Sequence, residues 1–235
     1  MPADFQRQLD MMPPQLLTHP VTIIGLGGIG SWTARIARKM GFRKFILWDH
    51  DRLEPHNLPS QDYEDVDLGE LKVDGIHRRL LHTLDDKEMT TIRQTKKFTD
   101  EDEFDEGIVI SAVDKMQSRA DIWEAVKKRK AFIPLFVDGR IGIEWNDELG
   151  KVGGEWMEIF TIIPARLEDR EFYEENLFSD DEIAPAHCTA QAVAYIGPII
   201  AGFIVSNIKM WLMKEPYRRH LLYDNLTKQF MDVTN

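Results

Sequence analysis

Cysteine is almost absent from this chain of 235 residues, which has only Cys188. One cysteine excludes a disulfide within the chain and a zinc site built from four cysteines. A long hydrophobic run is absent too. Residues 193–205 are apolar, but they are too few to cross a bilayer and they contain Gly197-Pro198. We therefore expect a buried core helix there and no membrane segment.

Basic residues are outnumbered, with 29 Lys and Arg against 40 Asp and Glu, and the formal net charge is −11. This excess of acid opposes a general affinity for nucleic acid and favours a basic protein partner, or a nucleotide that arrives with Mg²⁺. The N-terminus lacks the pattern of a signal peptide, so we expect a cytoplasmic protein. The apolar content of 43% is ample for a core, and we expect one domain over residues 1–235.

Short apolar runs alternate with segments of helical spacing through the first two thirds of the chain. Buried strands are predicted at residues 21–25, 44–49, 90–98, 107–114 and 131–145, the last as one or two strands. Helices are predicted at residues 31–41, 71–84 and 118–130. This alternation predicts an α/β fold, a Rossmann-like, doubly wound and mostly parallel sheet.

The pattern changes after residue 145. Residues 145–156 are rich in turn formers and predict a hairpin connection, with a returning strand at 157–164. Residues 220–233 predict a second hairpin around Asn225, so we expect an antiparallel C-terminal extension of the sheet. Between them, the acidic stretch at about 165–187 shows no clear periodicity and predicts a long, mobile loop.

A glycine-rich turn, GLGGIG, lies between the first strand and the first helix and contains Gly25, Gly27, Gly28 and Gly30. Glycine lets backbone N–H groups approach phosphate oxygens, and the helix N-terminus adds partial positive charge. Asp49 ends the next strand, where it is placed to accept hydrogen bonds from a ribose. These features fit NAD, FAD, S-adenosylmethionine or ATP.

Several further polar residues separate these options because they occur in one characteristic order. They are Arg7-Gln8, the glycine turn, Asp49 and Asp51, Asn57 and Gln61, Gly69 and Lys72, Asp114 and Arg119, and finally Cys188 followed by Gly197-Pro198. In this order the chain resembles the ubiquitin-activating-enzyme-like superfamily, in its small ThiF/MoeB/HesA branch. The resemblance covers roughly residues 7–230.

The resemblance implies an ATP-dependent adenylyltransferase that activates the C-terminal carboxylate of a small ubiquitin-like or sulfur-carrier protein ending in Gly-Gly. It implies that Asp49, with Asp51, Asn57 and Gln61, lines the nucleotide pocket, and that Lys72 neutralises charge near the α-phosphate. Asp114 would hold Mg²⁺. Arg7 would reach across a homodimer as an arginine finger.

Three departures from the family pattern bear on this prediction. Ser60 stands where the family has an arginine, so one positive charge is missing unless Lys115 or His56 replaces it. The paired cysteines that bind zinc in many members are absent. The residues before Gly197-Pro198 are bulkier than usual.

Some assignments stay open from the sequence alone. Cys188 is either a nucleophile for a transfer step, with His187 beside it, or a small buried side chain. Arg119 either serves the site or pairs with local carboxylates, and Arg140 is a candidate contact for the incoming tail. Alternative functions are adenylation of a peptide amide or of modified tRNA, and a binding scaffold that has lost turnover. An NAD dehydrogenase is the last alternative, because nothing indicates a hydride-transfer site.

Overall fold

The computed structural model describes residues 5–84, 86–179 and 193–231. These residues build one eight-stranded sheet in the order β3-β2-β1-β4-β5-β6-β7-β8. The strands are β1 (Val21–Ile24), β2 (Lys44–Trp48), β3 (Thr90–Gln94), β4 (Ile108–Ser111), β5 (Leu135–Asn146), β6 (Lys151–Ile162), β7 (His220–Asp224) and β8 (Gln229–Met231). The pairs from β3 through β5 are parallel and those from β5 through β8 are antiparallel, which confirms the predicted fold class.

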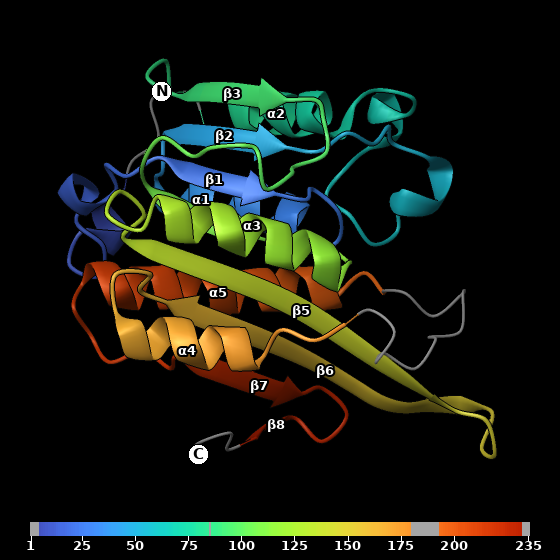
Figure 1. Ribbon diagram of the computed structural model, residues 1–235. Helices are drawn as coiled ribbons and strands as arrows, with labels where there is room; N and C mark the ends of the chain where they lie inside the picture. Colours follow the sequence, from blue (N-terminus) through green and yellow to red (C-terminus); the bar gives the residue numbers. More distant parts are fainter. Residues whose placement is uncertain (1–4, 85, 180–192, 232–235) are drawn as a thin grey trace.

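The sheet separates two layers of helices (Figure 1). The α-helices are α1 (Gly30–Met40), α2 (Lys72–Thr83), α3 (Met116–Lys128), α4 (Leu167–Glu175) and α5 (Ile196–Leu212). In the described ranges, four one-turn 3₁₀ helices precede or connect them: η1 (Gln6–Gln8), η2 (Pro14–Leu16), η3 (Pro55–Asn57) and η4 (Asp65–Asp67). In Figure 1, α3 and α4 lie in front of the sheet and α1, α2 and α5 lie behind it.

Two buried apolar clusters follow this division. The larger one joins side chains of α1, α2 and α5 to one face of the sheet, and the smaller one joins α3 and α4 to the other. The central strands β1 and β4 are buried along their whole length, as expected for parallel strands covered on both faces. The sequence signal for them was therefore a continuous apolar run, not an alternating one.

The order of the strands reverses next to β1. The chain moves from β1 to β2 and β3 on one side, and then crosses to β4 on the other side. Ligands of open α/β sheets bind beyond the carboxyl ends of the strands at such a reversal. A ligand site is therefore expected among the residues that follow β1, β2 and β4.

The prediction of a loop over residues 165–187 is wrong for residues 167–175, which form α4. In α4, the side chain of Tyr173 is fully buried against Trp123 of α3, and the carboxylate of Glu174 accepts a hydrogen bond from the indole of Trp123. The stretch has few apolar residues, which hid the helix. A usable signal was the pair Glu168 and Asp169 in the first turn, where acid suits the helix dipole.

The predicted hairpin connection was also too long. Residues 151–156 belong to strand β6, and β5 is one strand of 12 residues. The paired strands of this hairpin are therefore longer than predicted, and the turn between them is shorter. Glycines in this stretch indicated a turn. In the structure one of them, Gly154, packs against a tryptophan: a Cβ at Gly154 would stand 2.9 Å from the ring of Trp156, and one at Gly142, opposite Trp156 on β5, would stand 2.1 Å from it.

The apolar helix α5 packs against the glycine-rich turn. A Cβ at Gly197 would lie 2.3 Å from the carbonyl oxygen of Gly28 and 2.6 Å from the ring of Trp32. This close approach places the start of α5 behind the turn and confirms the predicted buried helix. In the described part of the chain, no helix has both the length and the apolar character needed to cross a membrane.

A pair of substitutions within α5 tests this contact. Gly197→Ala should lower the free energy of unfolding by about 1–3 kcal/mol, because the new methyl group must push apart backbone atoms. Gly202→Ala is the matched control: its Cβ would meet nothing within 4 Å, and alanine should stabilise the helix by up to about 1 kcal/mol. Urea unfolding of both variants gives the comparison, and equal stabilities would contradict the packing described.

Candidate functional site at the ends of β1, β2 and β4

The glycine-rich turn divides into structural and open positions. Gly25 has a positive φ of 86°, and a Cβ there would lie 2.6 Å from the carbonyl oxygen of Ala112. A Cβ at Gly30 would lie 1.8 Å from the carbonyl oxygen of Gly25. By contrast, the nearest atoms to a Cβ at Gly27 and at Gly28 are 4.0 and 3.8 Å away. The first and last glycines are thus required by the fold, whereas a Cβ at the middle two, which are half-exposed, would make only ordinary van der Waals contacts with Gln61 and Ser60.

Asp114 lies beside this turn. The N–H of Ala112 donates to the carbonyl of Ile24, and the side chain of Val113 contacts the Cβ position of Gly25 at 3.2 Å. Asp114 follows directly, is exposed, and makes no hydrogen bond or ion pair with the described residues. The structure therefore brings Asp114 and the glycine turn together, as the sequence predicted.

Asp49 is buried and already bonded to the protein. Its Oδ2 accepts a hydrogen bond from the N–H of Leu26 at 2.7 Å, and its Oδ1 accepts one from the N–H of Asp51 at 2.9 Å. The carboxylate therefore holds the glycine turn in shape. Each carboxylate oxygen has a second lone pair, so hydrogen bonds to a ribose remain chemically open to it.

Lys72 and Asp51 form an ion pair, with 2.9 Å between Nζ and Oδ2. Lys72 is buried, whereas 52% of the Asp51 side chain is exposed. Burial acts to raise the pKa of Asp51, but the hydrogen bond and charge of Lys72, with a smaller effect of His50, outweigh it and lower the pKa below its ordinary value. Asp51 is thus the ion-pair partner of Lys72.

The segment after η3 covers the turn. The Nε1 of Trp32 donates to the carbonyl of Ser60 at 3.2 Å, and the hydroxyl of Tyr63 donates to the carbonyl of Leu26 at 2.8 Å. Burial raises the pKa of Tyr63 well above its ordinary value, so the phenol stays protonated and keeps donating. Trp32 and Tyr63 were missed by sequence reasoning because only the path of the loop brings them to the turn.

Asn57 and Gln61 differ in what they reach. The side chain of Asn57 turns inward and its Oδ1 accepts a hydrogen bond from the N–H of Glu54, which caps η3. The Nε2 of Gln61 lies 4.0 Å from the Cβ position of Gly27, and its Oε1 is buried without a hydrogen-bond partner. Gln61 therefore borders the open part of the glycine turn, and Asn57 shapes the loop that carries it.

Arg7 does not reach the site of its own chain. The side chain of Gln8 donates to the carbonyl of Met40, at the last residue of α1, while the glycine turn adjoins the first residue. An α-helix rises about 1.5 Å per residue, so the 11 residues of α1 separate the two by roughly 16 Å. Arg7 is exposed at that far end.

The remaining candidates fall into three groups. Arg119 and Arg140 are both buried, and both guanidinium groups bond the carboxylate of Asp138. Lys115 is exposed beside Asp114, and His56 lies 3.3 Å from the carboxylate of Glu54. Cys188 and His187 lie outside the described residues, so their roles stay predictions.

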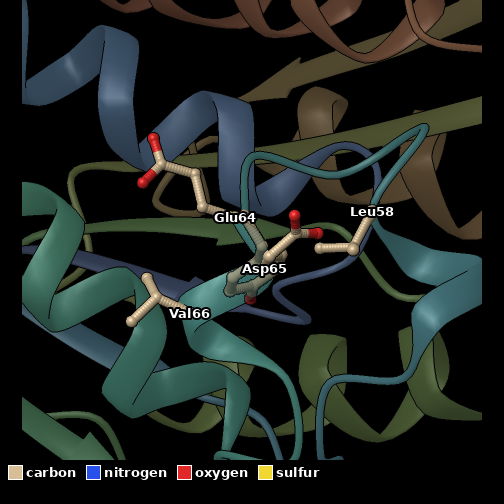
Figure 2. Close-up of a pocket in the computed structure, with 5 residues that line it drawn as sticks. Leu58, Glu64, Asp65 and Val66 are labelled. Carbon is tan, nitrogen blue, oxygen red and sulfur yellow. The ribbon is translucent and has the colours of Figure 1, made fainter.

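Two other features of the structure are weaker candidates for a ligand site. An open pocket of about 450 Å³ is lined by Leu58, Tyr63, Glu64, Asp65 and Val66 (Figure 2), and its acidic rim has the wrong charge for phosphate. Among the described residues, the ligand atoms of Asp49, His50 and Asp51 lie within 4.8 Å of one another. Both oxygens of Asp49 are already bonded to backbone N–H groups, and Oδ2 of Asp51 is bonded to Lys72.

The glycine turn, the acids at the strand ends and the buried α5 match a known family. The model of the ThiF family matches residues 14–235. This chain belongs to the ThiF family. Among curated proteins it is similar to the ubiquitin-like modifier-activating enzyme 5 of Bombyx mori, with 27% identity over 92% of this chain and 56% of that protein, and to that of Caenorhabditis elegans, with 24% identity over 82% and 47%. The chain thus spans about half the length of these relatives.

Solved structures share the fold of the family. E. coli MccB with ATP has a TM-score of 0.65 at 19% identity, over 93% of this chain and 64% of that one. E. coli TcdA, a tRNA N6-threonylcarbamoyladenosine dehydratase, has a TM-score of 0.63 at 16% identity, over 89% and 94%. PaaA has a TM-score of 0.67 at 16% identity, over 92% and 64%. MccB is solved with ATP and TcdA is a tRNA dehydratase, so the ThiF fold alone does not specify a substrate.

The ion pair beside the turn gives a prediction about pH. Lys72→Met should raise the pKa of Asp51, because burial persists while the cation is lost. In the wild type the folded-state pKa is the lower one, so the stabilisation by this pair is present above about pH 4 and is lost as pH falls through the folded pKa. Carboxyl ¹³C NMR titration measures the shift. The pKa of Asp102, which its own hydrogen bond with Lys96 lowers, should not change.

Proposed function

We propose that this protein is an ATP-dependent adenylyltransferase that activates the C-terminal carboxylate of a small ubiquitin-like or sulfur-carrier protein. The observation that carries the proposal is the contact of Gly25 with Ala112 and Val113, which sets Asp114, exposed and without a partner among the described residues, beside the half-exposed Gly27 and Gly28. Membership of the ThiF family and the names of its curated relatives support the same activity.

The chemistry of this reaction suits a site without a general base. A carboxylate is already ionised at neutral pH and needs no base to become a nucleophile. The difficulty is that one anion must attack the phosphorus of another, so catalysis consists of holding both in position and of supplying positive charge.

The chain's own groups meet part of this demand. The half-exposed backbone at Gly27 and Gly28, next to the first turn of α1, suits the approach of phosphate oxygens to backbone N–H groups. Asp49 is fixed by two backbone hydrogen bonds, and its remaining lone pairs suit ribose hydroxyls. Lys72 would contribute positive charge once a phosphate competes with Asp51 for its ammonium group.

The donors present fit a magnesium ion that arrives with the nucleotide. Mg²⁺ in nucleotide sites is usually held by one or two carboxylates together with phosphates and water. Asp114 supplies such a carboxylate, exposed and free of other partners in the described chain. When bound, the ion would screen the charge of the triphosphate.

Arg7 supports a homodimer in which each copy completes the other's site. Within one chain it lies at the opposite end of α1 from the glycine turn. Only a second copy can therefore bring this guanidinium to the phosphates. Arginine suits such a role because it stays charged and binds phosphate with a fork of N–H donors.

A second candidate function, a scaffold that binds a ubiquitin-like partner without turnover, is favoured by the scarcity of free positive charge. Ser60 replaces the family's arginine, Lys72 is paired with Asp51, and His56 lies beside Glu54. Lys115, exposed next to Asp114, is the cation best placed to compensate. Binding of ATP separates the two functions, because a scaffold has no need of it.

The enzyme proposal predicts binding of ATP that depends on Mg²⁺ and on Asp114. In calorimetric titrations, Mg²⁺ should tighten binding of ATP to the wild type, and Asp114→Asn should abolish that gain. Asp121→Asn is the matched control, since Asp121 lies on α3 and its carboxylate accepts a hydrogen bond from Gln117. A wild type that binds no ATP would favour the scaffold.

The homodimer proposal predicts complementation between inactive variants. Arg7→Ala and Asp114→Ala should each reduce ATP–pyrophosphate exchange, assayed with a partner protein ending in Gly-Gly, on the order of 10²–10³-fold. Mixing the two should restore about a quarter of the wild-type rate, because half of the random dimers are mixed and each contains one intact site. If mixing restores nothing, Arg7 acts within its own chain or not at all.

A further inference from the structure

A second cluster of charges is buried next to the proposed site, centred on Asp138 of β5. The Asp138 side chain is 0% exposed. Its Oδ1 accepts a hydrogen bond from Nη1 of Arg119 at 3.0 Å, and its Oδ2 accepts bonds from Nε of Arg140 at 2.7 Å and from the hydroxyl of Tyr173 at 3.0 Å. One carboxylate thus joins the first turn of α3, strand β5 and helix α4.

Stability alone does not account for this cluster. Removing charges from water is costly, and a well-packed apolar group of the same volume is often as stable as a buried ion pair or more so. What such a cluster supplies in addition is fixed geometry. The bonds to Asp138 therefore fix the segments that carry its partners.

The bond from Arg119 holds the segment that carries Asp114. This segment leaves β4 at Ala112, where it is fixed by the hydrogen bond to Ile24 and by its contact with Gly25. It enters α3 at Met116, and Arg119 ties that first turn to β5 through Asp138 and through the carbonyl of Gly139. Asp114 stands between these two anchors and has no partner of its own among the described residues.

Without Asp138, the guanidinium of Arg119 would keep few hydrogen bonds. Its Nε is buried without a hydrogen-bond partner, and its bond to the carbonyl of Gly139 is long, at 3.4 Å. Arg140 is better supported, because it also contacts the carboxylate of Glu158 at 3.5 Å and the carbonyl of Asn176 at 3.0 Å. Loss of the Asp138 charge should therefore free the first turn of α3 more than it frees β5.

We propose that Asp138 is a positioning residue that, through Arg119, fixes Asp114 where it can hold the magnesium ion of the nucleotide. The inference rests on the magnesium and ATP part of the proposed function, and it does not depend on the acceptor. Residues that orient a metal ligand through another side chain commonly change metal affinity by roughly 10–100-fold when they are replaced.

The test is titration of ATP into Asp138→Asn, with Mg²⁺ and again with EDTA. We expect affinity in Mg²⁺ to fall by roughly 10–100-fold while affinity in EDTA stays unchanged. The matched control is Asp86→Asn, which removes a carboxylate from another buried arginine, Arg38, near the far end of α1. This control should lower the melting temperature without changing the effect of Mg²⁺.

A second variant keeps the test decisive if Asp138→Asn does not fold. Arg119→Met leaves Asp138 bonded to Arg140 and Tyr173, and it should show the same selective loss of affinity in Mg²⁺. If the folded variants lose stability but keep the wild-type response to Mg²⁺, or if Asp86→Asn shows the same loss, the positioning role is overturned. If the wild type itself does not bind Mg²⁺–ATP, the proposed function fails together with this inference.

Discussion

The contact between the glycine turn and the end of β4 is the constraint on which the site depends. The backbone of Gly25 lies against Ala112 and Val113 so closely that no side chain fits at Gly25, and a Cβ at Gly30 would lie even closer to Gly25 itself. Strand β1, strand β4 and helix α1 are thus fixed to one another through backbone atoms. Because backbone atoms cannot rotate away as side chains can, the distance between the turn and the end of β4 at Ala112 is a property of the fold.

The distribution of charge around this contact is one-sided. Asp49 is bonded by backbone N–H groups and Asp51 by Lys72, so the acid that stays free is Asp114. Free cations near the turn are few, with Lys115 exposed and Ser60 in place of an arginine. A triphosphate bound here would meet mainly backbone dipoles, and the proposed function therefore adds a metal ion and a second chain to the charge that Lys72 and Lys115 supply.

The sequence was informative where a residue type has one usual structural role. The glycines of the turn, the apolar runs of β1 and β4, and the acids at the strand ends predicted the sheet and the meeting of Asp114 with the turn. It failed where a residue type has several uses. Gly153 and Gly154 indicated a turn inside what is strand β6, and scarce apolar residues hid α4, although one tyrosine anchors it.

Side-chain partners were the part of the site that no pattern contained. The pairing of Lys72 with Asp51, the bond from Tyr63 to Leu26 and the use of one carboxylate by Arg119 and Arg140 all depend on how loops and helices cross in space. The same is true of Arg7, which comes first in the motif order but lies a full helix length from the turn. Order along a chain identifies the groups of a site, and the distances fixed by rigid helices decide which of them a single copy can bring together.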